Sequence, residues 1–483
     1  MFILDHNCGY TVAILSKDTK YVFGVNELDE LLGSSLSPRS MVVVAGHPGS
    51  GKTTLASTIC YSNALRGHRC LYISFQEDRE KLFNNMKKLG IDLEKQEKQN
   101  MLLFLRIPTA RDIDGVVKTV SEVIDSYSPK VIVVDSINAL FTYVSDPDKR
   151  AWLQNYFYQL TLVINGIIIV VAEMPIDVER IDIGSIEFVA DVVLMLKSRI
   201  ERKIVSRYIE IRKARGSPIH ISEIPFRIVE GKGLEVFIPP VPIKINRIGR
   251  FYNLKIPLFR DVLGGIPADG VILIVYPPDS RMYISTLFIA EPVLENNLKI
   301  LVISFTEPPH VVEYFIESMA SRFGIDIDDV KNLVSRHVVA IESINPYSMS
   351  SDEIIIHIVS SIDRYRPDIV VVHGLEILYP LIHGDIAKGF NDISNLVQAL
   401  RSRGVLLIGL MSYIEEVYKI LSSLCDIVIR FFYEIVNKSI ENYVYVWKQN
   451  DFPRLYKVDF DTLLETLSEA LKHIVAPYKI NIR

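Results

Sequence analysis

The sequence predicts an α/β protein with two tandem domains, each a mostly parallel, twisted sheet flanked by helices. Apolar stretches of about five residues alternate with longer segments of helical period, which is typical of parallel strands joined by crossover helices. The same succession of stretches occurs twice along the chain. At 483 residues, the chain is also longer than one hydrophobic core usually serves, so two domains are expected.

The first domain shows the alternation most clearly. We expect strand, helix, strand and helix in turn over residues 41–45, 53–65, 70–75 and 78–89. Gly67 and Gly90 follow the two helices, where glycine commonly ends a helix because it adopts a left-handed backbone conformation. This alternation favours parallel strands, because each helix returns the chain to the same edge of the sheet.

The second domain repeats the first about 230 to 240 residues later. Three stretches recur in the same order. The stretch ISF at 73–75, followed by Glu77, recurs at 303–305, followed by Glu307. The stretch LGID at 89–92 recurs as FGID at 323–326, and SPKVIVV at 128–134 recurs as RPDIVVV at 366–372. The constant order and slowly drifting offset indicate a duplication with changes in loop length. Prolines cluster between the copies. We therefore predict a first domain over residues 1–238, a linker over 239–250 and a second domain over 251–483.

The composition argues against several classes of protein. The formal net charge of −5 is unlike that of a protein that coats nucleic acid. The four cysteines, Cys8, Cys60, Cys70 and Cys425, show neither a CxxC pair nor a disulfide framework, which indicates a reducing compartment. No apolar run has the length of a membrane span, and no signal-peptide core forms at the N-terminus. We expect a soluble, cytoplasmic protein without a transmembrane segment.

A phosphate-binding loop is predicted between the first strand and the first helix. Its residues fit the pattern GxxxxGK(S/T) and are Gly46, His47, Pro48, Gly49, Ser50, Gly51, Lys52, Thr53 and Thr54. Glycines let successive backbone N–H groups surround the β-phosphate, and the helix N-terminus adds its positive dipole. Lys52 would neutralise the β- and γ-oxygens, and the Thr53 hydroxyl would hold Mg²⁺. The loop therefore predicts binding of ATP and Mg²⁺.

Two acidic residues complete the predicted site. Asp135 ends the apolar stretch over residues 131–134, at the sheet edge where the loop opens, and is the expected second anchor for Mg²⁺. Glu77 follows the next strand along the chain and is the candidate base that orients water for hydrolysis. An acid at this position can also balance the dipole of the following helix, so both roles stay open for Glu77.

These residues resemble the KaiC-like ATPases of the RecA superfamily, in their two-domain, archaeal-type form. The resemblance covers nearly the whole chain. The segments that carry it are an entry segment (24–33), the loop (46–54), ISF (73–75), the strand that ends at Asp135 (131–136), EFVAD (187–191), KARG (213–216) and PF (225–226). It implies two RecA-like domains and a homo-oligomeric ring, a hexamer in the family, with ATP at each subunit boundary. It also implies that Lys213 and Arg215 reach the neighbour's γ-phosphate, with an exposed strand end as the alternative reading of these cations.

The second domain is expected to lack a nucleotide site. In the stretch aligned with the loop, residues 275–283, the glycines are gone, Met282 replaces the lysine and Tyr283 replaces the threonine. His373 stands where the first domain has Asp135. The second domain therefore lacks the positive charge that neutralises phosphate, the glycines that let phosphate approach the backbone, and the residues that hold the metal. Clock members of the family phosphorylate themselves in the second domain, and we expect no such autokinase activity here.

Three functions stay open at this stage. Gln76 stands where the family usually has the first of two acids, which favours slow ATP hydrolysis or none. We predict a weak ATP hydrolase whose ring acts as a regulatory or assembly switch on an unidentified protein partner. The alternatives are a non-hydrolysing ATP sensor resembling the flagellar-motor relatives, and a recombinase-like DNA-dependent ATPase. The acidic loop over residues 174–186 argues against DNA. A last helix over 461–474 is expected to pack on its own domain or to dock a partner.

Overall fold

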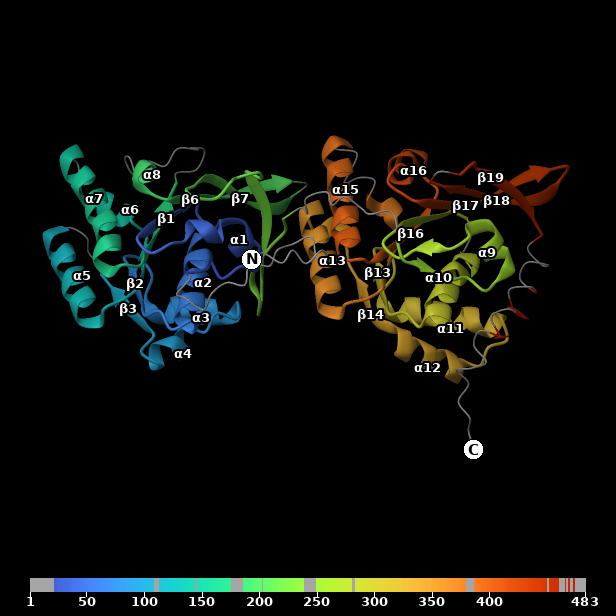
Figure 1. The fold of residues 1–483 in the computed structure, drawn as a ribbon, viewed down its shortest axis with the longest axis horizontal. Coiled ribbons are helices and arrows are strands. Elements are labelled where there is room, and N and C mark those ends of the chain that lie inside the picture. The colour runs from blue at the N-terminus through green and yellow to red at the C-terminus, as the bar shows by residue number, and fades with distance from the viewer. Residues whose placement is uncertain are drawn as a thin grey trace, which may run out of the picture. The chain divides into compact units, whose positions relative to one another are not determined.

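Figure 1 shows the computed structural model of the chain. The structure describes residues 21–107, 113–142, 144, 146–174, 186–201, 203–238, 249–279, 283–378, 386–449 and 451–459, and a few positions beyond them. The chain divides into two compact units, Met1–Ile238 and Pro239–Arg483. The predicted loop over 174–186 and the linker over 239–250 lie almost entirely outside the described residues, and so does most of the last helix expected over 461–474.

The described part of the first unit contains a nine-stranded sheet in the order β3-β2-β4-β5-β1-β6-β7-β8-β9. The strands are β1 (Ser40–Gly46), β2 (Cys70–Ser74), β3 (Leu102–Arg106), β4 (Val131–Asp135), β5 (Ile167–Glu173), β6 (Val192–Glu201), β7 (Ile204–Ala214), β8 (Glu223–Val229) and β9 (Gly233–Val236). All pairings from β3 to β6 are parallel, and β7 to β9 continue the sheet as antiparallel strands. The sheet is therefore mostly parallel, as predicted.

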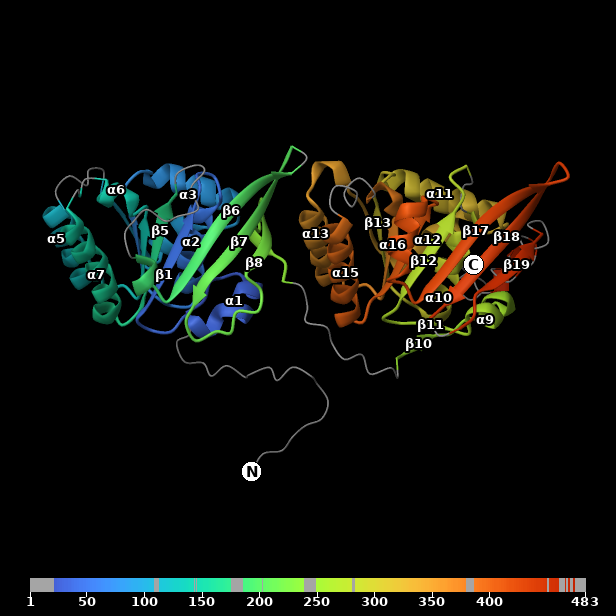
Figure 2. The ribbon, with the colours of Figure 1, turned by 90° about the horizontal axis from the view of Figure 1, so that it is seen from above.

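Helices cover both faces of this sheet (Figures 1 and 2). They are α1 (Asn26–Leu32), α2 (Lys52–Leu65), α3 (Arg79–Lys88), α4 (Leu93–Lys98), α5 (Ile113–Tyr127), α6 (Asn138–Phe141), α7 (Pro147–Ile164) and α8 (Ile186–Val189). On β1, Val42 and Val44 belong to the core beneath α1 to α4, whereas Val43 and Ala45 belong to the core beneath α5 to α8. Because successive side chains point to opposite faces and both are covered, the strand is apolar throughout.

The predicted boundaries agree closely with these elements. The helix expected over residues 53–65 is α2, and the one expected over 78–89 is α3, which begins after the N-cap Asp78. The Asp78 carboxylate accepts a hydrogen bond from the Lys81 N–H at 3.0 Å, which satisfies one of the free donors of the first turn. Gly67 and Gly90 follow the two helices with φ angles of 91° and 83°. Glycine thus ends each helix in the left-handed conformation that favours it.

The second unit has the same plan. Its described residues form an eight-stranded sheet in the order β14-β13-β15-β16-β12-β17-β18-β19. The strands are β12 (Val271–Tyr276), β13 (Ile300–Ser304), β14 (Val338–Ser343), β15 (Ile369–His373), β16 (Leu406–Ser412), β17 (Ile427–Val436), β18 (Ser439–Lys448) and β19 (Arg454–Val458), with a separate pair β10 (Phe251–Tyr252) and β11 (Ile266–Pro267). All pairings from β14 to β17 are parallel, and β18 and β19 continue the sheet as antiparallel strands. Two tandem α/β domains are therefore confirmed.

Helices also flank the second sheet on both faces (Figure 1). They are α9 (Pro257–Leu263), α10 (Tyr283–Asn296), α11 (Pro309–Arg322), α12 (Ile327–His337), α13 (Ser351–Tyr365), α15 (Ile386–Ser402) and α16 (Glu415–Ser422). Phe259 of α9 and Phe288 of α10 stack at 3.9 Å within the core on one face. Within the described part of the chain, the structure shows no helix that is long and apolar enough to cross a membrane.

One buried carboxylate ties the start of the second domain to α10. Glu291 Oε1 accepts hydrogen bonds from the backbone N–H groups of Lys255 at 2.6 Å and Ile256 at 2.5 Å. Its other oxygen, Oε2, is buried and has no hydrogen-bond partner among the described residues. Burial raises the pKa of Glu291 to about 7, although the two backbone hydrogen bonds oppose the rise.

We predict that Glu291 makes the second domain less stable as the pH rises from about 4.5 to about 7. The unfolded carboxyl titrates near pH 4.3, so between these values the folded state holds more protons than the unfolded state. The loss over this range is on the order of 3 kcal/mol. Denaturant unfolding of Glu291→Gln should show a smaller pH dependence of stability than that of the wild type. The control is Glu313→Gln, on the exposed face of α11, which should keep the pH dependence of the wild type. Equal pH slopes in the wild type and Glu291→Gln would contradict the assignment.

Candidate nucleotide site

The predicted phosphate-binding loop joins the end of β1 to the start of α2. Gly51 is the N-cap of α2 and has a φ angle of 100°, a left-handed conformation that a side chain would strain. A Cβ atom on Gly46 would lie 2.3 Å from the carbonyl oxygen of Leu196, so the loop also needs glycine for space. The free N–H groups of the first turn of α2 therefore open onto a glycine-lined loop, which is the usual arrangement for binding phosphate.

Lys52 lies inside the loop. Its side chain is almost fully buried, and Nζ donates a hydrogen bond to the carbonyl oxygen of His47 at 2.8 Å. Burial lowers the pKa of Lys52, and the charges of Glu173 and Asp135 oppose this shift. Glu173 ends β5 directly beside Gly46, and Asn138 binds its backbone with two hydrogen bonds, of 2.6 and 2.9 Å. The positive charge is therefore placed at the loop, next to two carboxylates.

Thr53 and Asp135 come together across the sheet edge. Thr53 Oγ1 donates a hydrogen bond to Asp135 Oδ2 at 3.0 Å, and the Tyr72 hydroxyl donates to the same oxygen at 2.7 Å. Burial raises the pKa of Asp135, and the hydrogen bonds from Tyr72 and Thr53 oppose that rise. A hydroxyl and a carboxylate are the hard oxygen ligands that Mg²⁺ prefers. Ser50 Oγ and Ser136 Oγ, also buried at this edge, have no hydrogen-bond partner among the described residues. These residues fit a magnesium nucleotide.

Glu77 lies at the same edge of the sheet. It follows β2, and its carbonyl oxygen accepts a hydrogen bond from Ser74 Oγ at 2.8 Å. Its carboxylate is 3.7 Å from Lys81 Nζ on α3, and 38% of the side chain is exposed. The negative charge of Glu77 contributes to the raised pKa of Asp135, which places the two carboxylates within electrostatic reach of each other.

Lys213 and Arg215 lie away from this loop. Lys213 of β7 pairs with Val193 of β6, and Val193 pairs with Val43 of β1. Along the strand direction, the lysine therefore lies three residues from Gly46, roughly 10 Å. Lys213 Nζ donates to the carbonyl oxygens of Glu187 at 2.9 Å and Phe188 at 3.0 Å. The Arg215 guanidinium contacts Asp191 at 3.2 Å. The structure therefore does not bring these two cations to the loop of their own chain.

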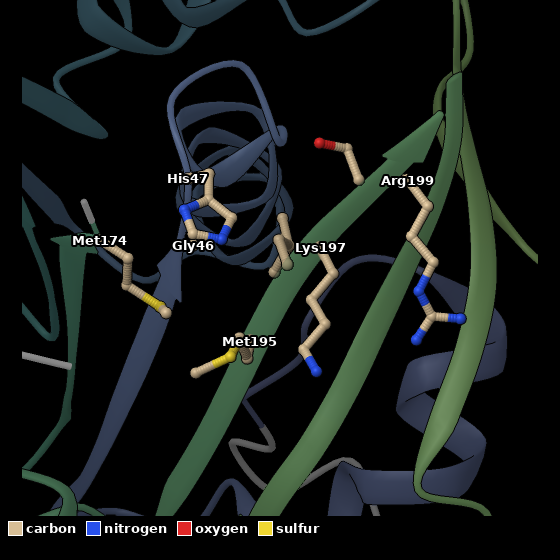
Figure 3. A pocket seen from close by; sticks show the side chains of 8 residues that line it. Gly46, His47, Met174, Met195, Lys197 and Arg199 are labelled. Atoms are coloured by element: carbon tan, nitrogen blue, oxygen red, sulfur yellow. The ribbon is translucent and has the colours of Figure 1, made fainter. Parts of the chain in front are cut away.

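A small pocket of about 100 Å³ adjoins the loop, between the ends of β1 and β5 and the middle of β6. Figure 3 shows the side chains of His47, Met174, Met195, Lys197 and Arg199 around it. Lys197 pairs with Glu210 at 2.6 Å and Arg199 with Glu223 at 2.7 Å. The basic side chains beside the loop are thus already matched by acids of the same sheet.

The second domain has a different set of side chains at the equivalent edge. His373 ends β15, in register with Ser304 at the end of β13. Its Nδ1 lies 3.1 Å from the Thr306 hydroxyl and 3.3 Å from the Ser304 hydroxyl, and its Nε2 lies 3.5 Å from the Tyr276 hydroxyl. Burial lowers the pKa of His373, against the charges of Glu376 and Glu307. Met282 lies outside the described residues, and α10 begins at Tyr283.

Sequence reasoning missed three residues of the first site, namely Tyr72, Asn138 and Glu173. Glu173 could have been found, because an acid that ends an apolar strand next to the loop strand lies at the same sheet edge as Asp135. Tyr72 gave no such signal, since it sits inside a buried strand like any core aromatic side chain.

The fold and this edge define a P-loop nucleotide-binding protein of the RecA-like α/β class. The sequence model of one protein family, described as "ATPase: KaiC", matches residues 22–240, which include the whole loop and Asp135. The first domain is therefore a KaiC-type ATPase domain, and the chain is similar to the KaiC-like ATPases of the RecA superfamily.

Relatives of the chain carry the same family name. It is 24% identical over 410 residues to "Circadian clock protein KaiC3" of Synechocystis, covering 81% of this chain and 76% of the relative. It is 27% identical over 204 residues to "Circadian clock oscillator protein KaiC" of Picosynechococcus, covering 42% and 40%. The oscillator protein of Thermosynechococcus vestitus is 26% identical over 223 residues, with coverage of 46% and 43%. The alignments with the two oscillator proteins therefore span less than half of each.

We predict that Lys52→Ala weakens nucleotide binding on the order of 100-fold. The substitution removes the buried ammonium from the loop, and loss of such a charge contact with phosphate costs about 3 kcal/mol, a factor on the order of 100. Titration with a fluorescent ATP analogue measures the affinity. The control is Lys88→Ala, an exposed lysine in the last turn of α3. Wild-type affinity in Lys52→Ala would refute the site.

Proposed function

We propose that this chain is a slow ATPase that binds one magnesium ATP in its first domain and assembles into a ring, a hexamer as in its family. The observation that carries the proposal is the convergence of Lys52, Thr53 and Asp135 at one sheet edge. At the equivalent edge of the second domain, His373 stands in place of the carboxylate. ATP turnover would act as a regulatory or assembly switch on a protein partner.

Each residue of the site has a distinct task in this proposal. The loop N–H groups and Lys52 bind the β- and γ-phosphates, and Thr53 and Asp135 hold the metal. Bound Mg²⁺ supplies positive charge that offsets the charge developing on the phosphate oxygens. Glu77 accepts a hydrogen bond from the attacking water and orients it toward the γ-phosphate. Its partial exposure keeps it within reach of solvent.

Completing the site requires a second subunit. Lys213 and Arg215 contact the carbonyl groups of α8 and the Asp191 carboxylate rather than their own loop, which supports this requirement. We propose that they stabilise the γ-phosphate charge in the neighbouring subunit. They would have to leave their contacts with the end of α8 and Asp191, which compete for both cations.

A non-hydrolysing ATP sensor is the second candidate. It is favoured by Gln76, which leaves Glu77 without an acid directly before it, and by the pairing of the Glu77 carboxylate with Lys81. A DNA-dependent ATPase is disfavoured, because Lys197 and Arg199 beside the loop are each matched by an acid. Phosphate release from the purified wild type separates the first two candidates.

We predict that Arg215→Ala keeps ATP affinity and lowers turnover by about 10³-fold, because a cation supplied across a subunit boundary chiefly stabilises the transition state. Arg66→Ala, at the exposed far end of α2, is the control. Mixing Arg215→Ala with Glu77→Gln subunits should restore part of the activity, since some boundaries then combine an intact arginine with an intact glutamate. Phosphate release that equals the weighted sum of the separate variants would contradict a shared site.

A further inference from the structure

Tyr72 is a buried tyrosine that contacts the acid of the site. It lies in β2, two residues before the end of the strand, and its side chain is 0% exposed. The hydroxyl donates to Asp135 Oδ2 at 2.7 Å, and Thr53 Oγ1 donates to the same atom at 3.0 Å. One oxygen of the carboxylate is therefore held from two sides, by β2 and by the first turn of α2.

Core packing holds the tyrosine ring in place. The ring stacks on Phe104 of β3, with centroids 5.9 Å apart and an interplanar angle of 23°. It belongs to the core between the sheet and α1 to α4. A phenylalanine would fill this space almost equally well, and a buried hydroxyl is unfavourable unless it is hydrogen-bonded. The hydroxyl of Tyr72 is thus explained by its contact with Asp135 rather than by packing.

The duplication inside the chain provides a comparison. Tyr72 precedes Ser74 by two positions, and Ser74 pairs with Asp135 across β2 and β4. In the second domain, Val302 precedes Ser304 by two positions, and Ser304 pairs with His373 across β13 and β15. Val302 is buried, as Tyr72 is. The copy that has lost the acid therefore also lacks the tyrosine, and an aliphatic side chain occupies its position in the core.

We propose that Tyr72 is a positioning residue that orients the Asp135 carboxylate for the metal it holds together with Thr53. This inference rests on the proposed function, which assigns Asp135 to Mg²⁺. The tyrosine does not touch the nucleotide or the metal in this account. It fixes the rotation of the carboxylate, so that the oxygen facing the loop is already in place when the magnesium nucleotide binds.

The test is the Mg²⁺ requirement of nucleotide binding in Tyr72→Phe. At a fixed concentration of a fluorescent ATP analogue, the half-saturating Mg²⁺ concentration should rise about tenfold, as expected when a hydrogen bond to a charged group is lost. Affinity for the analogue in EDTA should be unchanged. The matched control is Tyr127→Phe, which removes a hydroxyl that donates to the Asn100 carbonyl oxygen at 3.0 Å, in the same domain but away from the site. It should leave both values at wild type.

A double-mutant cycle separates this role from a general loss of stability. If Tyr72 acts through Asp135, Tyr72→Phe should add little to the raised Mg²⁺ requirement of Asp135→Asn. Full additivity, or a wild-type Mg²⁺ requirement in Tyr72→Phe while Asp135→Asn is impaired, would overturn the role of Tyr72 and leave the proposed function intact. Nucleotide binding by the wild type that is independent of Mg²⁺ would instead overturn the proposed function together with this inference. Thermal melting of each variant checks that the fold is retained.

Discussion

The hydrogen bond between Thr53 and Asp135 is the contact on which the site depends. It joins the first turn of α2 to the end of β4, although β5 lies between β4 and the loop strand β1. The helix must therefore pass across the sheet edge for the two side chains to meet. Parallel strands make this possible, because each of them ends at the same edge and delivers its next residue there. The loop glycines then bring the helix N-terminus onto that edge.

The equivalent sheet edge of the second domain carries different side chains. Its eight strands among the described residues follow the same order as the first eight strands of the first sheet, yet the edge is occupied by His373 and hydroxyl groups in place of the acid. A neutral imidazole among hydroxyls offers neither the charge nor the hard oxygen ligands that a magnesium nucleotide needs. The duplicated domain is therefore better suited to packing or to partner contacts than to binding a second ATP, and we infer that the two domains divide these tasks.

The fold and much of the site could be predicted from sequence because their signals are local. The loop motif occupies nine consecutive residues, and Asp135 directly follows its own apolar strand. Tyr72 and Asn138 could not be predicted, since their importance arises from contacts with residues about 35 to 63 positions away, at distances set by register and helix packing. The separation of Lys213 from Gly46 likewise appears only once β6 is paired with both β1 and β7.

We expect each chain to bind a single magnesium ATP, in its first domain. Calorimetric titration of the full chain with ATP in excess Mg²⁺ measures this stoichiometry directly. We expect saturation near one nucleotide per chain, whatever the oligomeric state. Saturation near two would show that the second domain, with His373 in place of the acid, still binds ATP, and would contradict the division of tasks between the domains.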